Sequence, residues 1–172
     1  SLLPKNWEIV VKENPSQLLP NTLHGERGRY SYYYSDLAHI PQVRVISIGT
    51  SQFDLIDKCR AVATLTGTTG WEACIRGKPV MAFGYAWYSG CEGVFRINNR
   101  TECIAAMGAI VGGVKLDQQK VRLFLKALEH HSFEGYPNLK ISAGAEGGIE
   151  NNSASVLEML EAFLIDSRGK NY

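Results

Sequence analysis

The chain has 172 residues, of which 45% are hydrophobic and 20% are charged, and its formal net charge is +1. This length allows one domain with its own hydrophobic core, and the ordinary composition is typical of a globular protein. The small net charge argues against bulk nucleic-acid binding and against a polybasic membrane surface, and no apolar run reaches the roughly 18 residues that a membrane-spanning helix needs.

Five short apolar runs predict five strands. They are WEIVV at 7–11, VRVISI at 43–48, AVATLT at 61–66, PVMAF at 79–83 and the shorter GVFRI at 93–97. Their nearly continuous apolar character, without strict alternation, is typical of parallel strands that are covered on both faces.

Helical patterns lie between and after these strands. They cover 30–40, 52–59 with Ser51 as the expected cap, 71–76 with Gly77 as the expected stop, 100–110, 117–131 and 153–165. Residues 142–152 are rich in glycine and polar residues and predict a flexible connector. Because strands alternate with helices, we expect an α/β fold, with a Rossmann-like parallel sheet and helices on both faces.

The four cysteines are expected to be free thiols. Cys59, Cys74, Cys91 and Cys103 form no C-x-x-C pair, and they do not interleave with histidines at zinc-site spacing. Thiols that remain reduced are typical of cytosolic proteins, and we expect no metal site and no cofactor.

The most informative stretch is TGTTG, which follows the third strand and opens the next helix. In a parallel sheet, ligands bind where strands end, and the first turn of a helix leaves backbone N–H groups unpaired with partial positive charge. Glycines allow close approach to that backbone, and hydroxyl groups add donors. Thr66, Gly67, Thr68, Thr69 and Gly70 therefore form a candidate phosphate cradle.

A purely structural interpretation of the same turn stays open. Thr69 and Glu72 have the T-x-x-E spacing of a capping box, in which both side chains only start the helix. Gly67 and Gly70 can likewise serve a tight strand-to-helix turn. The turn has neither the P-loop pattern nor the G-x-G-x-x-G pattern.

Polar residues at the ends of other strands extend the candidate site. Lys12 and Asn14 follow the first strand, and Lys12 is either a counter-charge for a phosphate or a solvated strand-end lysine. Lys78 precedes the fourth strand, and we expect it to be solvated.

Aromatic residues follow the fourth strand. Tyr85, Trp87 and Tyr88 can either stack on a base or sugar of a ligand or pack the loop onto the protein. We include Tyr85 and Tyr88 among the candidate substrate-binding residues.

Three segments together resemble a known family. VVKENP at 10–15, IPQVRVIS at 40–47 and AVATLTGTTGWEACIRGKPVMAFGYAWY at 61–88 resemble the bacterial capsule polysaccharide biosynthesis family, which includes the Kdo transferases of capsule assembly. The resemblance covers residues 7–88, about half of the chain. Its most specific part is Gly70–Ala73 with Gly77–Val80.

The resemblance implies a GT-B-type glycosyltransferase with two Rossmann-like domains that face a cleft. Residues 1–172 would be a single domain, most of the C-terminal, donor-binding one, and a fragment of a longer protein. The donor would be a nucleotide sugar, often CMP-linked, used without metal, with its phosphate at Thr66–Gly70. A glycan or lipid-linked acceptor would bind the absent domain. Such enzymes are cytoplasmic, with peripheral association at the inner membrane.

One position departs from the family pattern, because Asn14 stands where the family has histidine. Asparagine can donate a hydrogen bond but cannot carry charge or shuttle a proton. We nominate no catalytic residue in this chain, and Glu72 is a candidate contact to a ribose hydroxyl. Two alternatives stay open, a non-hydrolysing nucleotide-sugar 2-epimerase and a non-catalytic module of capsule assembly or export.

Overall fold

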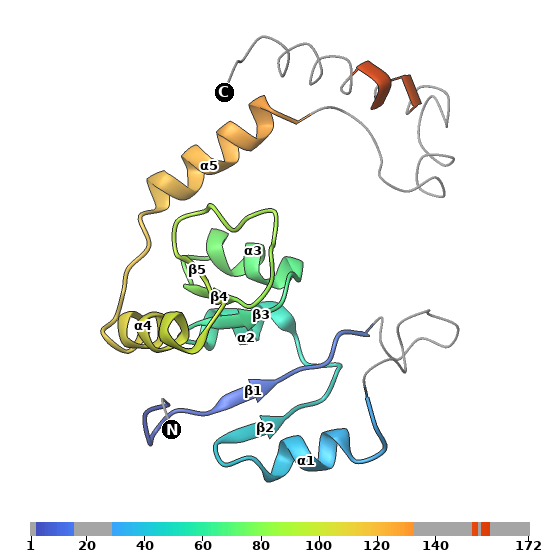
Figure 1. The fold of residues 1–172 in the computed structure, drawn as a ribbon, viewed down its shortest axis with the longest axis vertical. Coiled ribbons are helices and arrows are strands. Elements are labelled where there is room, and N and C mark those ends of the chain that lie inside the picture. Colours follow the sequence, from blue (N-terminus) through green and yellow to red (C-terminus); the bar gives the residue numbers. More distant parts are fainter. Residues whose placement is uncertain (1–2, 16–28, 133–152, 155, 159–172) are drawn as a thin grey trace. The chain divides into compact units, whose positions relative to one another are not determined.

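The computed structural model describes residues 3–15, 29–132, 153–154 and 156–158 (Figure 1). The chain divides into two units, Ser1–Phe124 and Leu125–Tyr172, and each is considered by itself. The first unit contains every described strand and four of the described helices in full.

The described elements follow the alternating order that the sequence predicts (Figure 1). In chain order they are β1 (Ile9–Val11), α1 (Tyr33–His39), β2 (Val43–Val45), α2 (Gln52–Lys58), β3 (Val62–Thr64), α3 (Thr68–Ile75), β4 (Val80–Ala82), β5 (Val94–Arg96), α4 (Arg100–Val111) and α5 (Gln118–His130). Residues 153–154 and 156–158 are helical, in agreement with the start of the predicted helix at 153–165. The rest of that helix and the expected connector at 142–152 lie outside the described residues.

Every strand pairing described is parallel, which confirms the α/β class. β1 pairs with β2, and β3, β4 and β5 form a second ladder in that order. In the second ladder Thr64 pairs with Ala82, and Ala82 pairs with Arg96. The carboxyl ends of these three strands therefore form one edge, and it is this edge that positions the candidate site.

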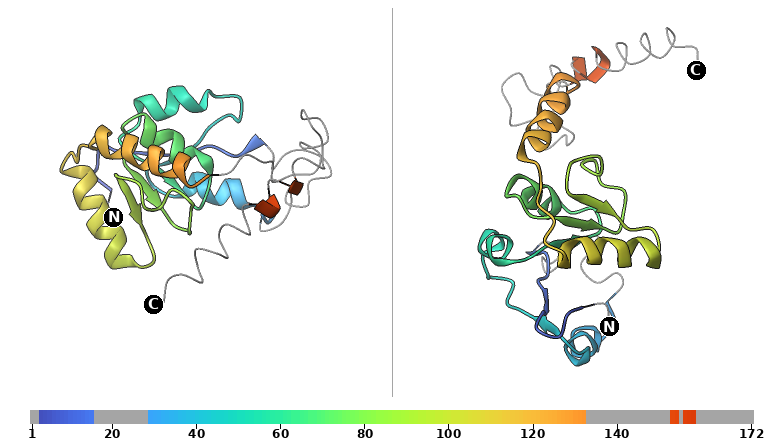
Figure 2. Two further views of the ribbon diagram at one scale, coloured as in Figure 1. Left: turned by 90° about the horizontal axis from the view of Figure 1, so that it is seen from above. Right: turned by 90° about the vertical axis from the view of Figure 1, so that its left-hand side faces the viewer.

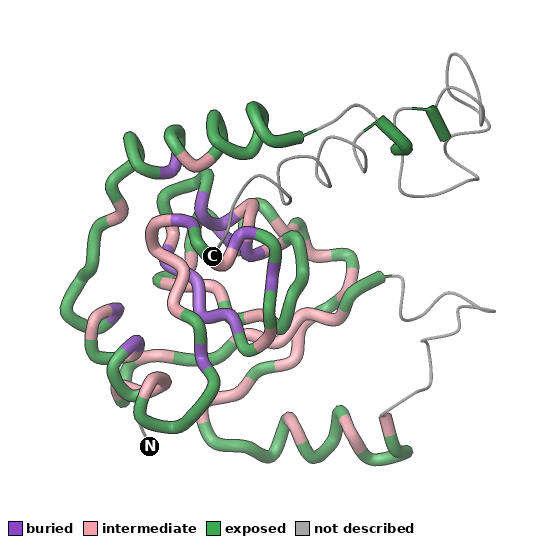
Figure 3. The backbone as a smooth tube through the Cα atoms, turned by 45° about the horizontal axis from the view of Figure 1, so that its top comes forward, coloured by how far each residue is buried: buried purple, intermediate pink, exposed green. Residues whose placement is uncertain are grey.

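Helices cover both faces of the β3–β4–β5 ladder, as predicted, and Figure 2 shows α3 and α4 on different sides of it. On the α3 face, the buried side chains of Val80, Ala73 and Cys74 belong to one cluster. On the α4 face, Met81, Ala106 and Ile110 belong to another. Most buried residues of the first unit lie in and around this ladder (Figure 3).

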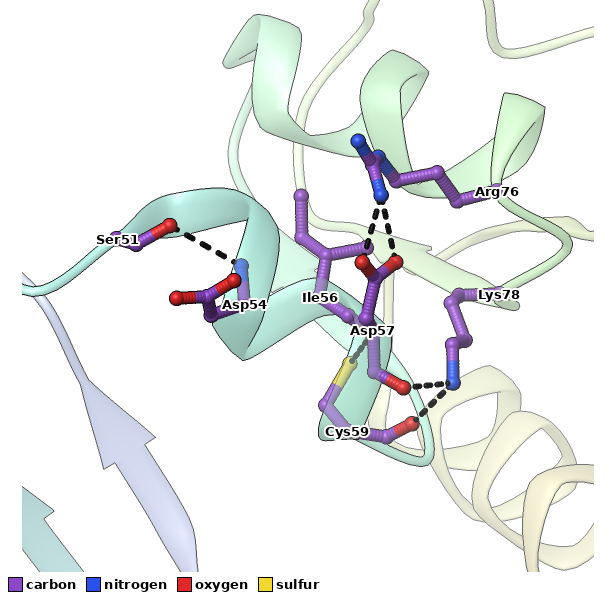
Figure 4. A network of polar contacts seen from close by, with 7 residues as sticks. All are labelled: Ser51, Asp54, Ile56, Asp57, Cys59, Arg76 and Lys78. Atoms are coloured by element: carbon purple, nitrogen blue, oxygen red, sulfur yellow. Dashed lines mark hydrogen bonds and ion pairs between the residues drawn. The ribbon is translucent and has the colours of Figure 1, made fainter.

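Polar contacts join α2 to α3 and to the start of β4 (Figure 4). Ser51 caps α2 as expected, because its side chain accepts a hydrogen bond from the Asp54 amide at 3.3 Å. Arg76 Nη1 lies 2.7 Å from both carboxylate oxygens of Asp57. These contacts fix the position of α2 beside the end of α3.

Lys78 is not the solvated lysine that the sequence suggested. Its Nζ donates hydrogen bonds to the carbonyl oxygens of Asp57 at 2.7 Å and Cys59 at 3.0 Å (Figure 4). These carbonyls lie at the C-terminal end of α2, where backbone acceptors lack partners within the helix. An ammonium group there satisfies the acceptors and opposes the negative end of the helix dipole.

Gly77 ends α3 as predicted and brings Lys78 to this position. Its φ of 74° lies in the left-handed region that glycine adopts without steric cost. The amides of Gly77 and Lys78 bond the carbonyls of Cys74 and Ala73 at 3.0 and 2.9 Å, as in a Schellman ending.

We expect Lys78→Met to lower the free energy of unfolding by about 1 kcal/mol, because methionine keeps the aliphatic stem and removes the ammonium donor. Chemical denaturation at neutral pH measures this loss. Lys115→Met is the matched control at an exposed lysine, and an equal effect in both variants would contradict the capping role of Lys78.

Candidate functional site: the turn between β3 and α3

The turn at residues 65–70 leads from β3 into α3. α3 begins at Thr68, and Gly67 occupies its N-cap position without a side-chain hydrogen bond to the helix start. The capping box predicted from Thr69 and Glu72 is therefore wrong, since Thr69 already lies inside the helix. The Glu72 carboxylate instead accepts a hydrogen bond from Gln52 Nε2 on α2.

The start of α3 has donors without partners. Among the described residues, none accepts a hydrogen bond from the amides of Thr68 and Thr69, and none pairs with the hydroxyls of Thr66, Thr68 or Thr69. Thr66 and Thr68 are exposed, and Thr69 is half-buried. Two neighbouring amides at the positive end of a helix, with hydroxyls around them, can bind an anionic oxygen.

The starts of α2 and α4 differ from the start of α3. Ser51 caps α2, and the Asn99 side chain accepts a hydrogen bond from the Glu102 amide at 2.9 Å at the start of α4. In both helices the capped amide is the third of the helix, and the equivalent amide of α3, that of Gly70, bonds the Gly67 carbonyl at 3.1 Å. α3 differs in that no side chain of its N-cap residue stands over the first turn, so the amides of Thr68 and Thr69 are open to a ligand.

Tyr88 supports the turn from inside the protein. Its side chain is fully buried, and its hydroxyl donates a hydrogen bond to the Gly67 carbonyl oxygen at 2.5 Å. Burial raises the pKa of Tyr88, so the hydroxyl stays protonated and remains a donor. Of the two interpretations of this residue, packing applies, because the ring has no exposed face on which a ligand could stack.

Gly70 lies directly against Tyr88. A Cβ atom at position 70 would overlap the hydroxyl and ring carbons of that tyrosine. Gly70 is therefore required by close packing, and it is buried beneath the turn. Gly70 contributes to the site by letting α3 pack closely on the Tyr88 ring.

The loop after β4 runs beside the turn. Gly67 N donates to Thr64 Oγ1 at 3.2 Å, and Gly84 N donates to the Leu65 carbonyl at 3.1 Å. A Cβ atom on Gly84 would lie 2.8 Å from Thr66 Cγ2. The absence of a side chain on Gly84 thus allows the loop to approach Thr66.

Tyr85 and Trp87 remain exposed on this loop, in contrast to Tyr88. Tyr85 is 79% exposed, and the guanidinium carbon of Arg96 lies 5.2 Å from its ring centroid. Trp87 is half exposed and packs against Trp71, with ring centroids 5.0 Å apart. Tyr85 can therefore offer a ring to a ligand, whereas Trp87 is largely a packing residue.

Sequence analysis did not identify Arg96 as a site residue. It is the last residue of β5, at the same edge of the sheet as the turn. Like Lys12, Arg96 is a charged residue at the carboxyl end of a strand, and this shared pattern could have predicted it.

Lys12 and Asn14 belong to the other ladder. Both follow β1, and among the described residues no ladder hydrogen bond joins β1–β2 to β3–β4–β5. Between them, Glu13 accepts hydrogen bonds from Arg29 Nε at 2.9 Å and from the Tyr34 hydroxyl at 2.8 Å. Glu13 thus links the end of β1 to Tyr34 in α1 and to Arg29, which precedes that helix.

Residues 3–15, 29–132, 153–154 and 156–158 contain no group of three histidine, cysteine or acidic residues that could hold a metal. They also contain no helix with the length and hydropathy needed to cross a membrane. An apolar groove of about 360 Å³ is lined by Leu3, Pro4, Ile104, Met107, Gly108 and Val111, none of which belongs to the turn.

Comparison with known proteins gives one match. A family model described as "Capsule polysaccharide biosynthesis protein" matches residues 3–103, which include β1 to β5 and the turn. No curated protein and no solved structure matches the chain.

We expect Gly70→Ala to lower the free energy of unfolding by about 1–3 kcal/mol, since the added methyl group must displace Tyr88 from a packed core. Gly108→Ala is the matched control, because it is also helical and its Cβ would meet no atom within 4 Å. That control should be neutral or stabilising by up to about 1 kcal/mol. Thermal and chemical denaturation of both variants test the contrast, and equal stabilities would refute it.

We expect Glu13→Gln to destabilise the protein at pH 7 by about 1 kcal/mol, allowing for solvent screening at this partly exposed cluster. Burial tends to raise the pKa of Glu13, but hydrogen bonds from Tyr34, the Asn14 amide and Arg29 outweigh it and leave the pKa below its ordinary 4.5. The stabilisation is therefore complete above pH 4.5 and is lost as the pH falls through the lowered value. The difference between the two proteins in urea titrations should shrink on acidification, and a difference independent of pH would contradict this assignment.

Proposed function

The chain belongs to the capsule polysaccharide biosynthesis protein family, and from this premise we propose that it binds the nucleotide-sugar donor of a glycosyltransferase. The domain would be the donor-binding half of a GT-B-type enzyme. Its α/β fold, with parallel strands and a glycine-rich turn at their carboxyl edge, suits a nucleotide ligand.

One observation carries this proposal: the partnerless amides of Thr68 and Thr69 at the start of α3. A phosphate oxygen accepts hydrogen bonds from such amides, and the helix dipole favours its negative charge. The hydroxyls of Thr66 and Thr68 can donate to the remaining phosphate oxygens. The ligand needs no movement of the backbone, because Tyr88 already holds the Gly67 peptide in place.

The same contacts would assist transfer of the sugar. When the bond between the anomeric carbon and the phosphate breaks, negative charge grows on the departing nucleotide. Preorganised amides stabilise that charge more than they stabilise the bound donor, and this difference lowers the barrier. The acceptor, a glycan or lipid-linked glycan, and the general base would come from a second domain.

The nature of the donor and the location of the protein are parts of the proposal. The family resemblance favours a CMP-linked sugar and a metal-independent reaction in the cytoplasm, at the inner face of the membrane. Asn14 can hydrogen-bond to the nucleotide, whereas it cannot act as an acid or base. Tyr85 is an exposed ring on the loop that follows β4, at the carboxyl edge of the ladder, and it belongs to the proposed site.

Asn14 also favours a second candidate function, a non-catalytic module that binds a sugar nucleotide during capsule assembly or export. The two functions predict the same binding site and differ in turnover. Incubation of the protein with donor and acceptor separates them, because transfer releases free nucleotide and a binding module releases none.

We expect the 172-residue chain to bind at least one of CMP, UDP and GDP or their sugars in isothermal titration calorimetry. Thr68→Val should weaken that binding about fivefold, since it removes one hydroxyl donor and keeps the branched side-chain shape. Thr101→Val is the matched control, as an exposed threonine in the first turn of α4.

No binding by the wild-type chain to any of these nucleotides would refute the proposed donor site. Equal affinities of the Thr68→Val and Thr101→Val variants would remove the turn from the site, even where the chain itself binds a nucleotide.

A further inference from the structure

The β3–β4–β5 register places Arg96 on the same face of the sheet as the turn. Thr64, Ala82 and Arg96 pair across the three strands, and paired residues of neighbouring strands project to one face. This is the α3 face, because Val62, Val80 and Val94, two residues earlier in each strand, belong to the cluster that contains α3. Two strand spacings, about 10 Å, separate Arg96 from Thr64, a span that an arginine side chain can largely bridge.

Tyr85 contacts the guanidinium of Arg96 from the loop that approaches the turn. The Gly84 amide bonds the Leu65 carbonyl of the turn at 3.1 Å, the next residue is Tyr85, and the Tyr85 ring lies 5.2 Å from the guanidinium carbon of Arg96. A guanidinium stacked on an aromatic ring keeps its edge N–H groups available for an anion. Both side chains are exposed, so a ligand bound at the turn can reach them.

The charge of Arg96 is not neutralised by an ion pair among the described residues. Arg96 contributes to lowering the pKa of Glu102, but hydrogen bonds from Asn98 and Asn99 lower that pKa more. The Glu102 carboxylate accepts those hydrogen bonds from the two residues that precede α4.

We infer that Arg96 is a phosphate-binding residue of this site and that Tyr85 positions its guanidinium. The inference rests on the proposed nucleotide-binding function and adds to it the fixed positive charge that the turn itself lacks. Arg96 would contact a non-bridging oxygen of the phosphate group held by Thr68 and Thr69. Arginine suits this role because its planar guanidinium can donate two hydrogen bonds to one phosphate.

Calorimetric titration of the 172-residue chain with CMP and UDP tests the inference, with cytidine and uridine as probes that lack phosphate. Arg96→Ala should weaken nucleotide binding about tenfold and leave any nucleoside binding unchanged. Arg96→Lys should restore part of the affinity, because it keeps the charge but loses the paired donors. Arg60→Ala is the matched control, an exposed arginine before β3 at the opposite edge of the ladder.

The positioning role of Tyr85 has its own test. Tyr85→Leu should weaken CMP and UDP binding about threefold when Arg96 is present, and Tyr85→Phe should retain the affinity. In the Arg96→Ala background, Tyr85→Leu should have no further effect, because the guanidinium that it positions is gone. Melting temperatures should stay near that of the wild-type chain, since both side chains are exposed.

The outcomes distinguish this inference from the function on which it rests. If the affinity of Arg96→Ala for CMP and UDP is within twofold of the wild type while Thr68→Val binds more weakly, Arg96 has no role in binding. The turn then remains the nucleotide site. Equal losses for nucleotides and nucleosides would show a structural effect and also overturn it. No binding of CMP, UDP, GDP or their sugars by the wild-type chain overturns both proposals.

Discussion

The contact between Tyr88 and the glycines of the turn is the constraint on which the rest of the site depends. A fully buried ring lies under Gly70, and its hydroxyl binds the Gly67 carbonyl. Only glycine at position 70 leaves room for this ring. The contact therefore fixes how closely α3 packs on the ring and how the peptide before the helix is oriented. At the start of this helix the amides of Thr68 and Thr69 have no partner among the described residues.

The surrounding charges separate into two groups. Arg76, Lys78 and Asp57 bind one another or nearby backbone around the end of α2, away from the carboxyl edge of the sheet. At that edge, Arg96 contacts a neutral aromatic ring. Charges with protein partners stabilise the fold, whereas a charge at the same edge of the sheet as exposed helix-start amides adds to a positive potential that can attract an anionic ligand.

The proposed donor site is thus supported by two independent arguments. The family match covers β1 to β5 and links the chain to capsule synthesis without identifying a ligand. At the turn, backbone donors, hydroxyls and an arginine lie at one edge of the sheet, and these groups support the proposal that a phosphate binds there. β1 belongs to a different ladder. In the proposed site, Lys12 and Asn14 would therefore contact a part of the ligand that extends beyond the turn.

The local sequence was sufficient for the elements themselves. Apolar runs, the Ser51 cap and the Gly77 stop depend on neighbours a few residues away, and the strands, helices and parallel class that they predicted are confirmed. Only the tertiary structure decided what the individual side chains do. Tyr85 and Tyr88 look equivalent in the sequence, yet one is exposed and the other is buried.

The same holds for the charged residues. The capping role predicted for Glu72 and the solvated state predicted for Lys78 are wrong, because their partners lie about 20 residues away along the chain. Arg96 was overlooked because its contact with Tyr85 joins a strand end to a separate loop. Local patterns record hydrogen bonds and packing within a turn or two of chain. Burial and long-range contacts arise only when the strands align, so the local sequence located the turn, whereas the fold determined which groups surround it.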